Sequence, residues 1–289
     1  MDIELQLKQT YGDRMTFIHQ EVYVDNDLSK GLREPLEAFG LETEPWLFAF
    51  DRDGRVAARL EGSFGSRAFE DANQGRAVMS DAVRHPIFAR VYDRMSAKAE
   101  DAGQDAHRRE LLAGLGGRVI EVGAGNGLNF KHYPATVASV LAVEPEAYLR
   151  QRANEESTRA AIPIEVVDGL ADELPAEDAR FDAAVASLML CSVPDQQLAL
   201  AEMRRVIRPG GELRFYEHVR ANEPRLARFQ DLARPGWRLL AGGCHPNRDT
   251  VRAIQQAGFE IQQQRRFAFR PCIIELPVTP RVLGIAKRP

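Results

Sequence analysis

The chain has 289 residues, of which 44% are hydrophobic and 28% charged, and its 38 Lys and Arg against 42 Asp and Glu give a net charge of −4. At roughly 150 residues per domain this length predicts two domains, with the composition of an ordinary globular protein. This charge balance argues against non-specific electrostatic binding to nucleic acid or anionic lipid. No apolar stretch approaches the ~20 residues that a membrane-spanning helix needs.

The three cysteines, Cys191, Cys244 and Cys272, are few and far apart in the sequence. Their spacing supports neither a disulfide framework nor a tetrahedral zinc site, so we predict no bound metal. The first fifteen residues mix charged and apolar side chains and do not resemble a signal peptide. These features predict a reduced, cytoplasmic protein that binds no nucleic acid.

Residues 1–75 read as strand, helix, strand, strand and short helix. Alternating β-branched and aromatic residues favour a strand over 15–24, and apolar residues at helical spacing favour a helix over 28–39. The segments 46–50 and 55–60 flank the turn sequence Asp51-Arg52-Asp53-Gly54, which predicts a β-hairpin. A short helix over 66–73 ends this part.

This first part resembles the C-terminal half of a thioredoxin-like domain, which has the same element order. In that family a proline that is usually cis precedes the hairpin, where Pro45 stands here. No cysteine precedes Cys191, so the redox-active Cys-x-x-Cys half is absent and we expect no redox role. We interpret 1–75 as a partial domain whose open sheet edge is covered by the second domain or by another subunit, as in a homodimer.

Residues 76–289 alternate strands and helices, which predicts an α/β fold with a parallel sheet covered by helices on both faces. Apolar residues at spacing four favour a helix over 81–100, and a second helix follows through Leu111 and Leu115. The last two strands have no helix between them and should pair antiparallel. Strands are expected over 118–123, 137–144, 164–168, 181–187, 212–218, 259–267 and 282–287, and helices over 126–132, 146–160, 196–207 and 247–257.

The sharpest motif, Glu121-Val122-Gly123-Ala124-Gly125-Asn126-Gly127, directly follows the first strand of this sheet. Glycines let a backbone approach a ligand closely, and ligands of open α/β sheets bind beyond the carboxyl ends of the strands. Dinucleotide dehydrogenases use a related pattern. The carboxylate of Glu121, two residues before the first glycine, suits a cationic ligand better than a pyrophosphate.

Two further acidic residues end the next two strands. Glu144 follows Gly125 by 19 residues and can accept hydrogen bonds from both hydroxyls of a ribose. Asp168 can accept from an adenine amino group, while the amide of Leu170 donates to the ring. Each acidic residue alone could cap a helix, but three at successive strand ends predict a nucleoside-sulfonium site.

These residues resemble the class I S-adenosylmethionine-dependent methyltransferases over about residues 80–287. The matching motifs are EVGAGNG (121–127), AVEP (142–145), VDGLADELP (167–175), FDAAVASLMLCSVPD (181–195) and RRVIRPGGELRFYEH (204–218). More narrowly, LCSV, EHV and GGCHPNRDT resemble a methyltransferase-like group associated with thiol S-methylation and once thought to act on phospholipid. Unlike the animal members, the chain is expected to have no N-terminal membrane anchor. The resemblance implies a Rossmann-like, seven-stranded sheet and S-adenosylmethionine as cofactor.

The family's pattern also implies roles for individual residues. Tyr92, in the helix ahead of the sheet, matches an aromatic that closes over the cofactor, although ordinary helix packing would also explain it. The implied positions are Gly123, Gly125 and Asn126 at the methionine part, Glu144 at the ribose, Asp168, Gly169 and Leu170 at the adenine, and Ser187 and Leu188 beside the reactive methyl group.

Methyl transfer needs alignment and a water-excluded pocket more than covalent catalysis. A thiol needs little help from a general base, whereas a phenol or alcohol needs more. His218, which follows the fifth strand, and His245, in the loop Gly243-Cys244-His245-Pro246, are the candidate bases, and either could instead serve a structural role. Nucleophilic catalysis by Cys191 or Cys244 is not expected, because free cysteine is commonly a small buried hydrophobe.

Apolar residues over 224–240 and the helix over 81–100 predict a lid and a small, hydrophobic acceptor. We therefore predict a methyltransferase acting on a small molecule, with a thiol preferred. The alternatives are methylation of an amine, a phenol or a phospholipid headgroup, and a cofactor-binding protein, such as a scaffold or a cyclase, that transfers no methyl group. A nicotinamide oxidoreductase is disfavoured by Glu121 and by Asp168-Gly169.

Overall fold

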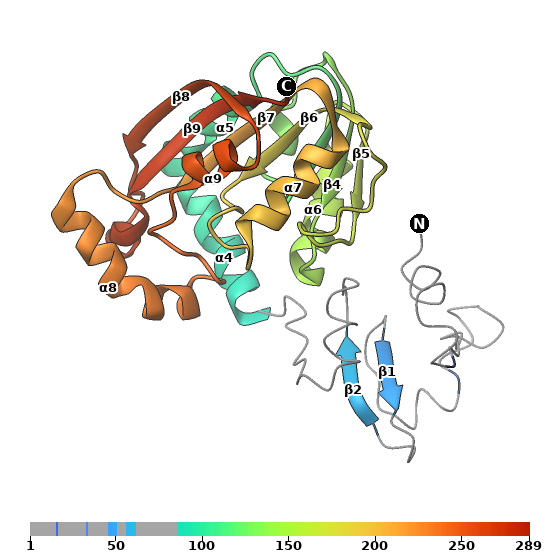
Figure 1. Ribbon diagram of the computed structural model, residues 1–289, viewed down its shortest axis with the longest axis horizontal. Coiled ribbons are helices and arrows are strands. Elements are labelled where there is room, and N and C mark those ends of the chain that lie inside the picture. Colours follow the sequence, from blue (N-terminus) through green and yellow to red (C-terminus); the bar gives the residue numbers. More distant parts are fainter. Residues whose placement is uncertain (1–15, 17–32, 34–45, 51–55, 62–85) are drawn as a thin grey trace. The chain divides into compact units, whose positions relative to one another are not determined.

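The computed structural model describes residues 16, 33, 46–50, 56–61 and 86–289, and the chain divides into two compact units, Met1–Ala82 and Val83–Pro289 (Figure 1). In the first unit, β1 (Trp46–Phe50) and β2 (Val56–Glu61) pair antiparallel, which confirms the predicted hairpin. The other elements expected before residue 75, Pro45, the thioredoxin-like character and the domain boundary lie outside the described residues and stay predictions.

The second unit is built on a seven-stranded sheet with the strand order β5-β4-β3-β6-β7-β9-β8. The first five strands in this order run parallel, whereas β9 is antiparallel to both β7 and β8, as the missing crossover helix predicted. The strands are β3 (Gly117–Val122), β4 (Val137–Val143), β5 (Ile164–Val167), β6 (Phe181–Ser187), β7 (Ile207–His218), β8 (Glu260–Ala268) and β9 (Pro280–Lys287).

Helices α6, α7, α8 and α9 begin where acidic side chains cap free backbone amides. Glu146 accepts from the amide of Leu149, and Asp195 accepts from the first amides of the next helix, as an N-cap residue does. The helices are α4 (Pro86–Ala99), α5 (Asp105–Leu112), α6 (Ala147–Ser157), α7 (Gln196–Val206), α8 (Pro224–Leu240) and α9 (Thr250–Gln256). A π-helical turn, Glu100–Gln104, joins α4 to α5.

Alternate residues of the central strands enter two separate apolar layers, because successive side chains of a strand point to opposite faces. On one face Ile120 and Val122 pack with α7 and α9 residues such as Leu200 and Ile254. On the other face Val119 packs with side chains from α5 and α6, and all of these residues are buried. Helices therefore cover both faces, and the carboxyl ends of β3 to β7 meet along one edge of the sheet (Figure 1).

The helix expected over 126–132 is wrong, since only the 3-10 turn Phe130–His132 forms there. Gly127 adopts a φ of +79°, which an α-helix cannot include. The Asn126 and Asn129 side chains are instead used in hydrogen bonds to other segments, and Pro134 follows at once.

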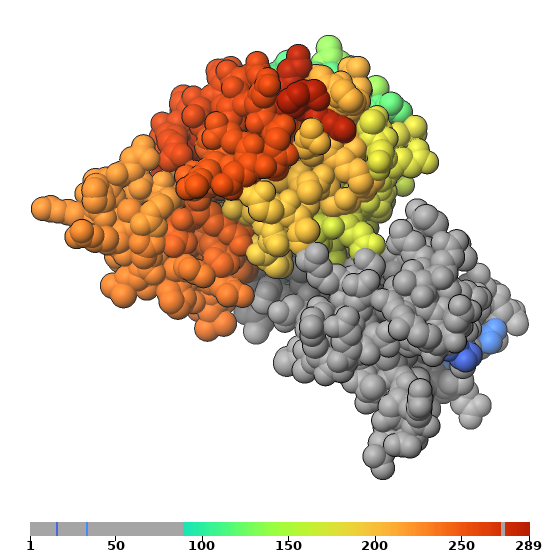
Figure 2. All heavy atoms as spheres, in the orientation of Figure 1, coloured from blue at the N-terminus to red at the C-terminus, as the bar shows by residue number. Residues whose placement is uncertain are grey.

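The surface of α8 carries large apolar side chains that no described part of the chain buries. Leu232, Leu239 and Leu240 are 82%, 83% and 77% exposed. Figure 2 shows this helix in orange, projecting at one end of the second unit. Among the described helices none is long and apolar enough to cross a membrane.

Candidate functional site

The glycine motif forms a tight loop at the carboxyl end of β3. The amides of Gly123 and Ala124 both donate to the carbonyl of Val143, at 2.8 and 3.1 Å, so the chain folds back over the end of β4. Gly123 has a φ of +70°, and a Cβ there would lie 2.7 Å from the Cβ of Met189. Only glycine satisfies both conditions, which keeps the loop's backbone accessible to a ligand.

Glu144 lies directly beneath this loop. Its Oε2 accepts from the amide of Gly125 at 2.7 Å and its Oε1 from the amide of Glu146 at 3.0 Å. Burial raises the pKa of Glu144 to about 7, against the lowering effect of these two backbone donors. Each oxygen retains acceptor capacity, because an ionised carboxylate offers about four lone-pair sites.

Asp168 follows β5 and is joined to the end of β4 through Arg150. The guanidinium of Arg150 donates to Asp168 at 3.1 Å and to the carbonyls of Glu144 and Pro145 at 2.8 and 2.9 Å. The next residue, Gly169, packs so closely that a Cβ would lie 2.9 Å from the side chain of Val143. The ends of β4 and β5 are thus held together at the edge where the glycine loop stands.

Helix α4 is fastened onto the glycine loop by polar side chains. Asn126 donates to Asp93 at 2.7 Å and to Ser96 at 3.1 Å, and the hydroxyl of Tyr148 donates to the other oxygen of Asp93 at 3.1 Å. The ring of Tyr92 lies against the loop, since a Cβ on Gly125 would stand 3.7 Å from it. The predicted aromatic therefore lies beside the predicted methionine-binding loop.

Glu121 has different partners from those that the sequence suggested. Its two oxygens accept from the side-chain amide of Asn129 at 2.8 Å and from the hydroxyl of Tyr133 at 2.7 Å. The side chain is 1% exposed, and burial raises its pKa to about 7. In this structure Glu121 anchors the segment after the glycine loop to β3, and its contact with a cationic ligand stays a prediction.

Sequence reasoning missed Arg108, which is buried beneath the end of β6. Its guanidinium donates to Asn129 at 2.9 Å, to Ser187 at 3.2 Å and to Glu100 at 2.8 Å. An arginine in an amphipathic helix such as α5 is usually exposed, so the local sequence does not indicate that Arg108 is buried at the site.

Beside Ser187, the backbone of Leu188 turns sharply as the chain leaves β6. Leu188 has a φ of +59°, which is uncommon for a residue other than glycine, and its amide donates to the carbonyl of Tyr216 at 2.7 Å. Strained backbone of this kind clusters at functional sites.

The two candidate bases differ in their surroundings. His218 ends β7 and its Nδ1 faces the sulfurs of Cys191 and Cys244, whereas its Nε2 is buried without a partner among the described residues. Burial and neighbouring arginines lower the pKa of His245 to about 4, so this imidazole is neutral and a weak base at pH 7. The hydrogen bond with Cys244, together with burial, raises the pKa of Cys191, so its thiol stays protonated.

Comparison with known proteins finds similarity over the part of the chain that holds this candidate site. A family model described as "Methyltransferase domain" matches residues 120–215, which include the glycine loop and the ends of β4, β5 and β6. The human protein named thiol S-methyltransferase TMT1B is 33% identical over 195 residues, which cover 63% of this chain and 78% of that protein.

One further relative and one solved structure widen the comparison. A protein of Cereibacter sphaeroides named phosphatidylethanolamine N-methyltransferase is 33% identical over 157 residues, covering 51% of this chain and 75% of that protein. The structure of a Thermotoga maritima protein, titled SAM-dependent methyltransferase and possible histamine N-methyltransferase, superposes with a TM-score of 0.55 at 20% identity. That match covers 70% of this chain and 97% of the Thermotoga chain, and it shows a shared fold.

Proposed function

Because the chain belongs to the class I S-adenosylmethionine-dependent methyltransferases, we propose that it transfers the cofactor's methyl group to the sulfur of a small thiol. The family accounts for the enzyme class and the cofactor. The choice of a thiol rests on one observation, the 33% identity to human thiol S-methyltransferase TMT1B over 78% of that protein.

The described residues fit the cofactor. A Cβ added to Gly125 would meet the ring of Tyr92 at ordinary contact distance, 3.7 Å, so the ring borders the loop without overlapping it. Each oxygen of Glu144 accepts one backbone donor and can accept another. Two ribose hydroxyls need such acceptors. In this proposal Gly123, Gly125, Asn126 and Tyr92 hold the methionine part, Glu144 the ribose, Asp168, Gly169 and Leu170 the adenine, and Ser187 and Leu188 border the methyl group.

When bound, S-adenosylmethionine supplies a methyl group on a sulfonium that a nucleophile can take by in-line displacement. The chain's own residues then have to orient the reactants and keep water out, which is the work of positioning rather than of covalent catalysis. The Asn126–Asp93 hydrogen bond keeps α4 on the glycine loop. A thiol, a few per cent ionised at pH 7, suits a site whose His245 is a weak base.

We propose further that the acceptor is hydrophobic, because α8 presents Leu232, Leu239 and Leu240 outside the core. The test is incubation of the full chain with methyl-labelled cofactor and matched acceptors, namely an aromatic thiol, the corresponding phenol and the corresponding amine. Labelled thioether should form from the thiol at least ten times faster than the other two products. Transfer to the phenol or amine with none to the thiol would overturn the proposed acceptor.

A second candidate acceptor is the amine of a phospholipid headgroup, which the resemblance to the Cereibacter sphaeroides phosphatidylethanolamine N-methyltransferase favours. The same labelled cofactor, offered with vesicles containing phosphatidylethanolamine, tests it. Label in the lipid fraction would establish this acceptor, and label confined to the thiol product would exclude it.

A further inference from the structure

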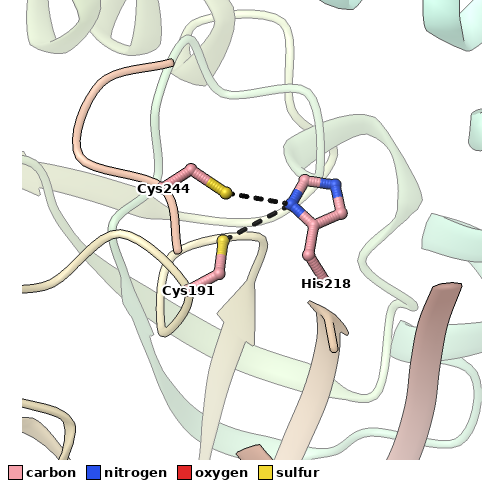
Figure 3. A group of neighbouring side chains, drawn as sticks. All are labelled: Cys191, His218 and Cys244. Carbon is pink, nitrogen blue, oxygen red and sulfur yellow. Dashed lines mark hydrogen bonds between the residues drawn. The ribbon is translucent and has the colours of Figure 1, made fainter. Parts of the chain in front are cut away.

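Cys191 and His218 lie 27 residues apart in the sequence, and His218 and Cys244 lie 26 apart, yet the fold brings the three side chains together (Figure 3). Cys191 lies in the turn after β6, and His218 is the last residue of the neighbouring strand β7. Cys244 lies in the loop that follows α8. Three elements therefore contribute one ligand atom each, at the edge of the sheet where the acceptor is expected.

The distances within this group match a metal site. Nδ1 of His218 is 3.5 Å from Sγ of Cys191 and 3.6 Å from Sγ of Cys244, and all three atoms lie within 4.8 Å of one another. With Zn–S bonds of about 2.3 Å and Zn–N bonds of about 2.0 Å, tetrahedral coordination separates a sulfur from a nitrogen ligand by about 3.5 Å. A zinc ion would therefore fit with little movement of the side chains.

The backbone around the cysteines is held in place by hydrogen bonds. The buried carboxylate of Glu217 accepts from the amides of Met189, Leu190 and Cys191 at 3.0, 2.9 and 3.1 Å. The amide of His245 donates to the carbonyl of Cys191 at 2.8 Å, which presses the loop carrying Cys244 against the turn carrying Cys191. Such support around the ligands is what gives a metal site its fixed geometry.

Two buried nitrogens in this region have no hydrogen-bond partner among the described residues. Trp237 packs against the apolar cluster of Cys191, Cys244 and Val278, and its indole N–H is buried without a hydrogen-bond partner in the described part of the chain. Nε2 of His218 is in the same condition. An N–H needs an acceptor atom, which a metal ion does not supply, so these two nitrogens leave room for a further polar group and the case for the ion rests on the three ligand atoms.

Among the described residues a second cluster of metal-ligating side chains, Glu100, Asp105 and His132, also holds buried polar atoms without a hydrogen-bond partner, but it differs in its charges. Lys131 lies 2.7 Å from Asp105, and Arg108 lies 2.8 Å from Glu100. Cationic side chains already balance its carboxylates, so an added metal ion would gain less there than at the two cysteines.

We propose that Cys191, His218 and Cys244 bind a zinc-type divalent ion whose fourth position takes the sulfur of the acceptor. Three protein ligands with one open position are the pattern of catalytic zinc sites. Sγ of Cys191 lies 3.5 Å from the carbonyl of Leu188, the residue assigned beside the methyl group, so a bound sulfur would stand near its reaction partner. The claim that the fourth position takes the sulfur of the acceptor rests on the proposed function. Binding of the ion displaces the protons of the Cys191 and Cys244 thiols to solvent. An acceptor thiol that then binds also releases its proton to solvent and coordinates as thiolate, so no redox change occurs.

Cobalt(II) tests the site directly, because its thiolate complexes absorb visible and near-ultraviolet light. The full chain, reduced with a phosphine and stripped with a chelator, should bind one Co²⁺ per chain with thiolate-to-metal absorption, and Zn²⁺ should displace it. Cys244→Ser and His218→Gln should each weaken Co²⁺ binding at least 100-fold. Cys272→Ser is the matched control, because Cys272 lies outside the cluster, and should bind as the wild type does.

Thermal unfolding of the same proteins guards against misfolded variants. Zn²⁺ should raise the Tm of the wild type and of Cys272→Ser but not that of folded Cys244→Ser, since a ligand stabilises only a protein that binds it. Absence of cobalt absorption in the wild type, or equal absorption in Cys244→Ser, would overturn the site. A Cys191–Cys244 disulfide found by mass spectrometry in the phosphine-reduced protein would also overturn it.

The fourth position is tested with thiophenol against phenol. Thiophenol should shift the absorption spectrum of the cobalt protein and phenol should not. A spectrum that thiophenol leaves unchanged would overturn the claim that the acceptor sulfur binds the metal. If metal-free protein methylates thiols as fast as the metal-bound protein, the claim that the acceptor sulfur binds the metal is overturned, while the proposed function stands. If instead thiophenol shifts the cobalt spectrum but no thiol is methylated, the proposed function is overturned and the metal site stands.

Discussion

Glu144 at the end of β4 accepts a 2.7 Å hydrogen bond from the backbone amide of Gly125 in the loop after β3. One buried carboxylate thus sets the position of the loop and presents its remaining lone pairs beside it. The same group would serve as support for the methionine-binding backbone and as acceptor for the ribose, which makes it the most informative position for mutation.

Replacing Glu144 by Ala should weaken cofactor binding about 10- to 100-fold, because hydrogen bonds to a charged group are worth about 1.5–3 kcal/mol. Glu144→Gln should have a smaller effect, since one acceptor oxygen remains. Isothermal titration with S-adenosylmethionine measures both. Glu165→Ala, an exposed position on β5, is the control, and unchanged affinity in Glu144→Ala would refute the ribose assignment.

Replacing Asp168 by Ala should lower the affinity for the cofactor about tenfold, through loss of an acceptor for the adenine amino group. The loss should be the same for S-adenosylhomocysteine, because the two molecules share the adenine. Fluorescence or calorimetric titration with each compound provides the measurement. Asp172→Ala, exposed four residues further on, should bind normally; a difference between the two ligands would contradict the assigned contact.

Gly123→Ala should destabilise the protein by about 1–3 kcal/mol and abolish cofactor binding. The new Cβ would stand 2.7 Å from Met189 on a backbone with a φ of +70°, so strain and overlap add. Thermal unfolding and titration measure the two effects. Gly236→Ala in α8, where nothing lies within 4 Å, should be neutral or slightly stabilising. Equal Tm changes in the two variants would show that the loop tolerates a side chain.

Glu121 should make stability depend on pH near neutrality. Its folded-state pKa is raised by burial from 4.5 to about 7, so the stability it contributes is full below about pH 4.5 and is lost as the pH rises through about 7. Glutamine does not titrate. The Tm of Glu121→Gln minus that of the wild type should therefore increase between about pH 5 and pH 8, whereas exposed Glu165→Gln should show a constant difference. A flat difference for Glu121→Gln would mean that the carboxyl is not buried as described.

Much of the fold could be predicted because its signals are local. Alternation of apolar strands with amphipathic helices fixed the class of the sheet, and Glu144 and Asp168 were found because each ends a strand. The carboxyl ends of neighbouring parallel strands lie at one edge, so the position of such residues in the sequence already implies that they meet. The helix expected over 126–132 failed because Asn126 and Asn129 bind side chains from α4 and β3, which local periodicity does not report.

By itself, then, the sequence determined the alternating sheet, the glycine loop and the acidic strand ends, since these depend on residues close together in the chain. Only the tertiary structure decided what lies around them. It buried Arg108 under Ser187, turned Glu121 toward Asn129 and Tyr133, and brought Cys191, His218 and Cys244 within reach of one ion. The spacing of the cysteines in the sequence predicts no metal site, because it does not report the distances between separate elements. Those distances are set only when the elements pack together.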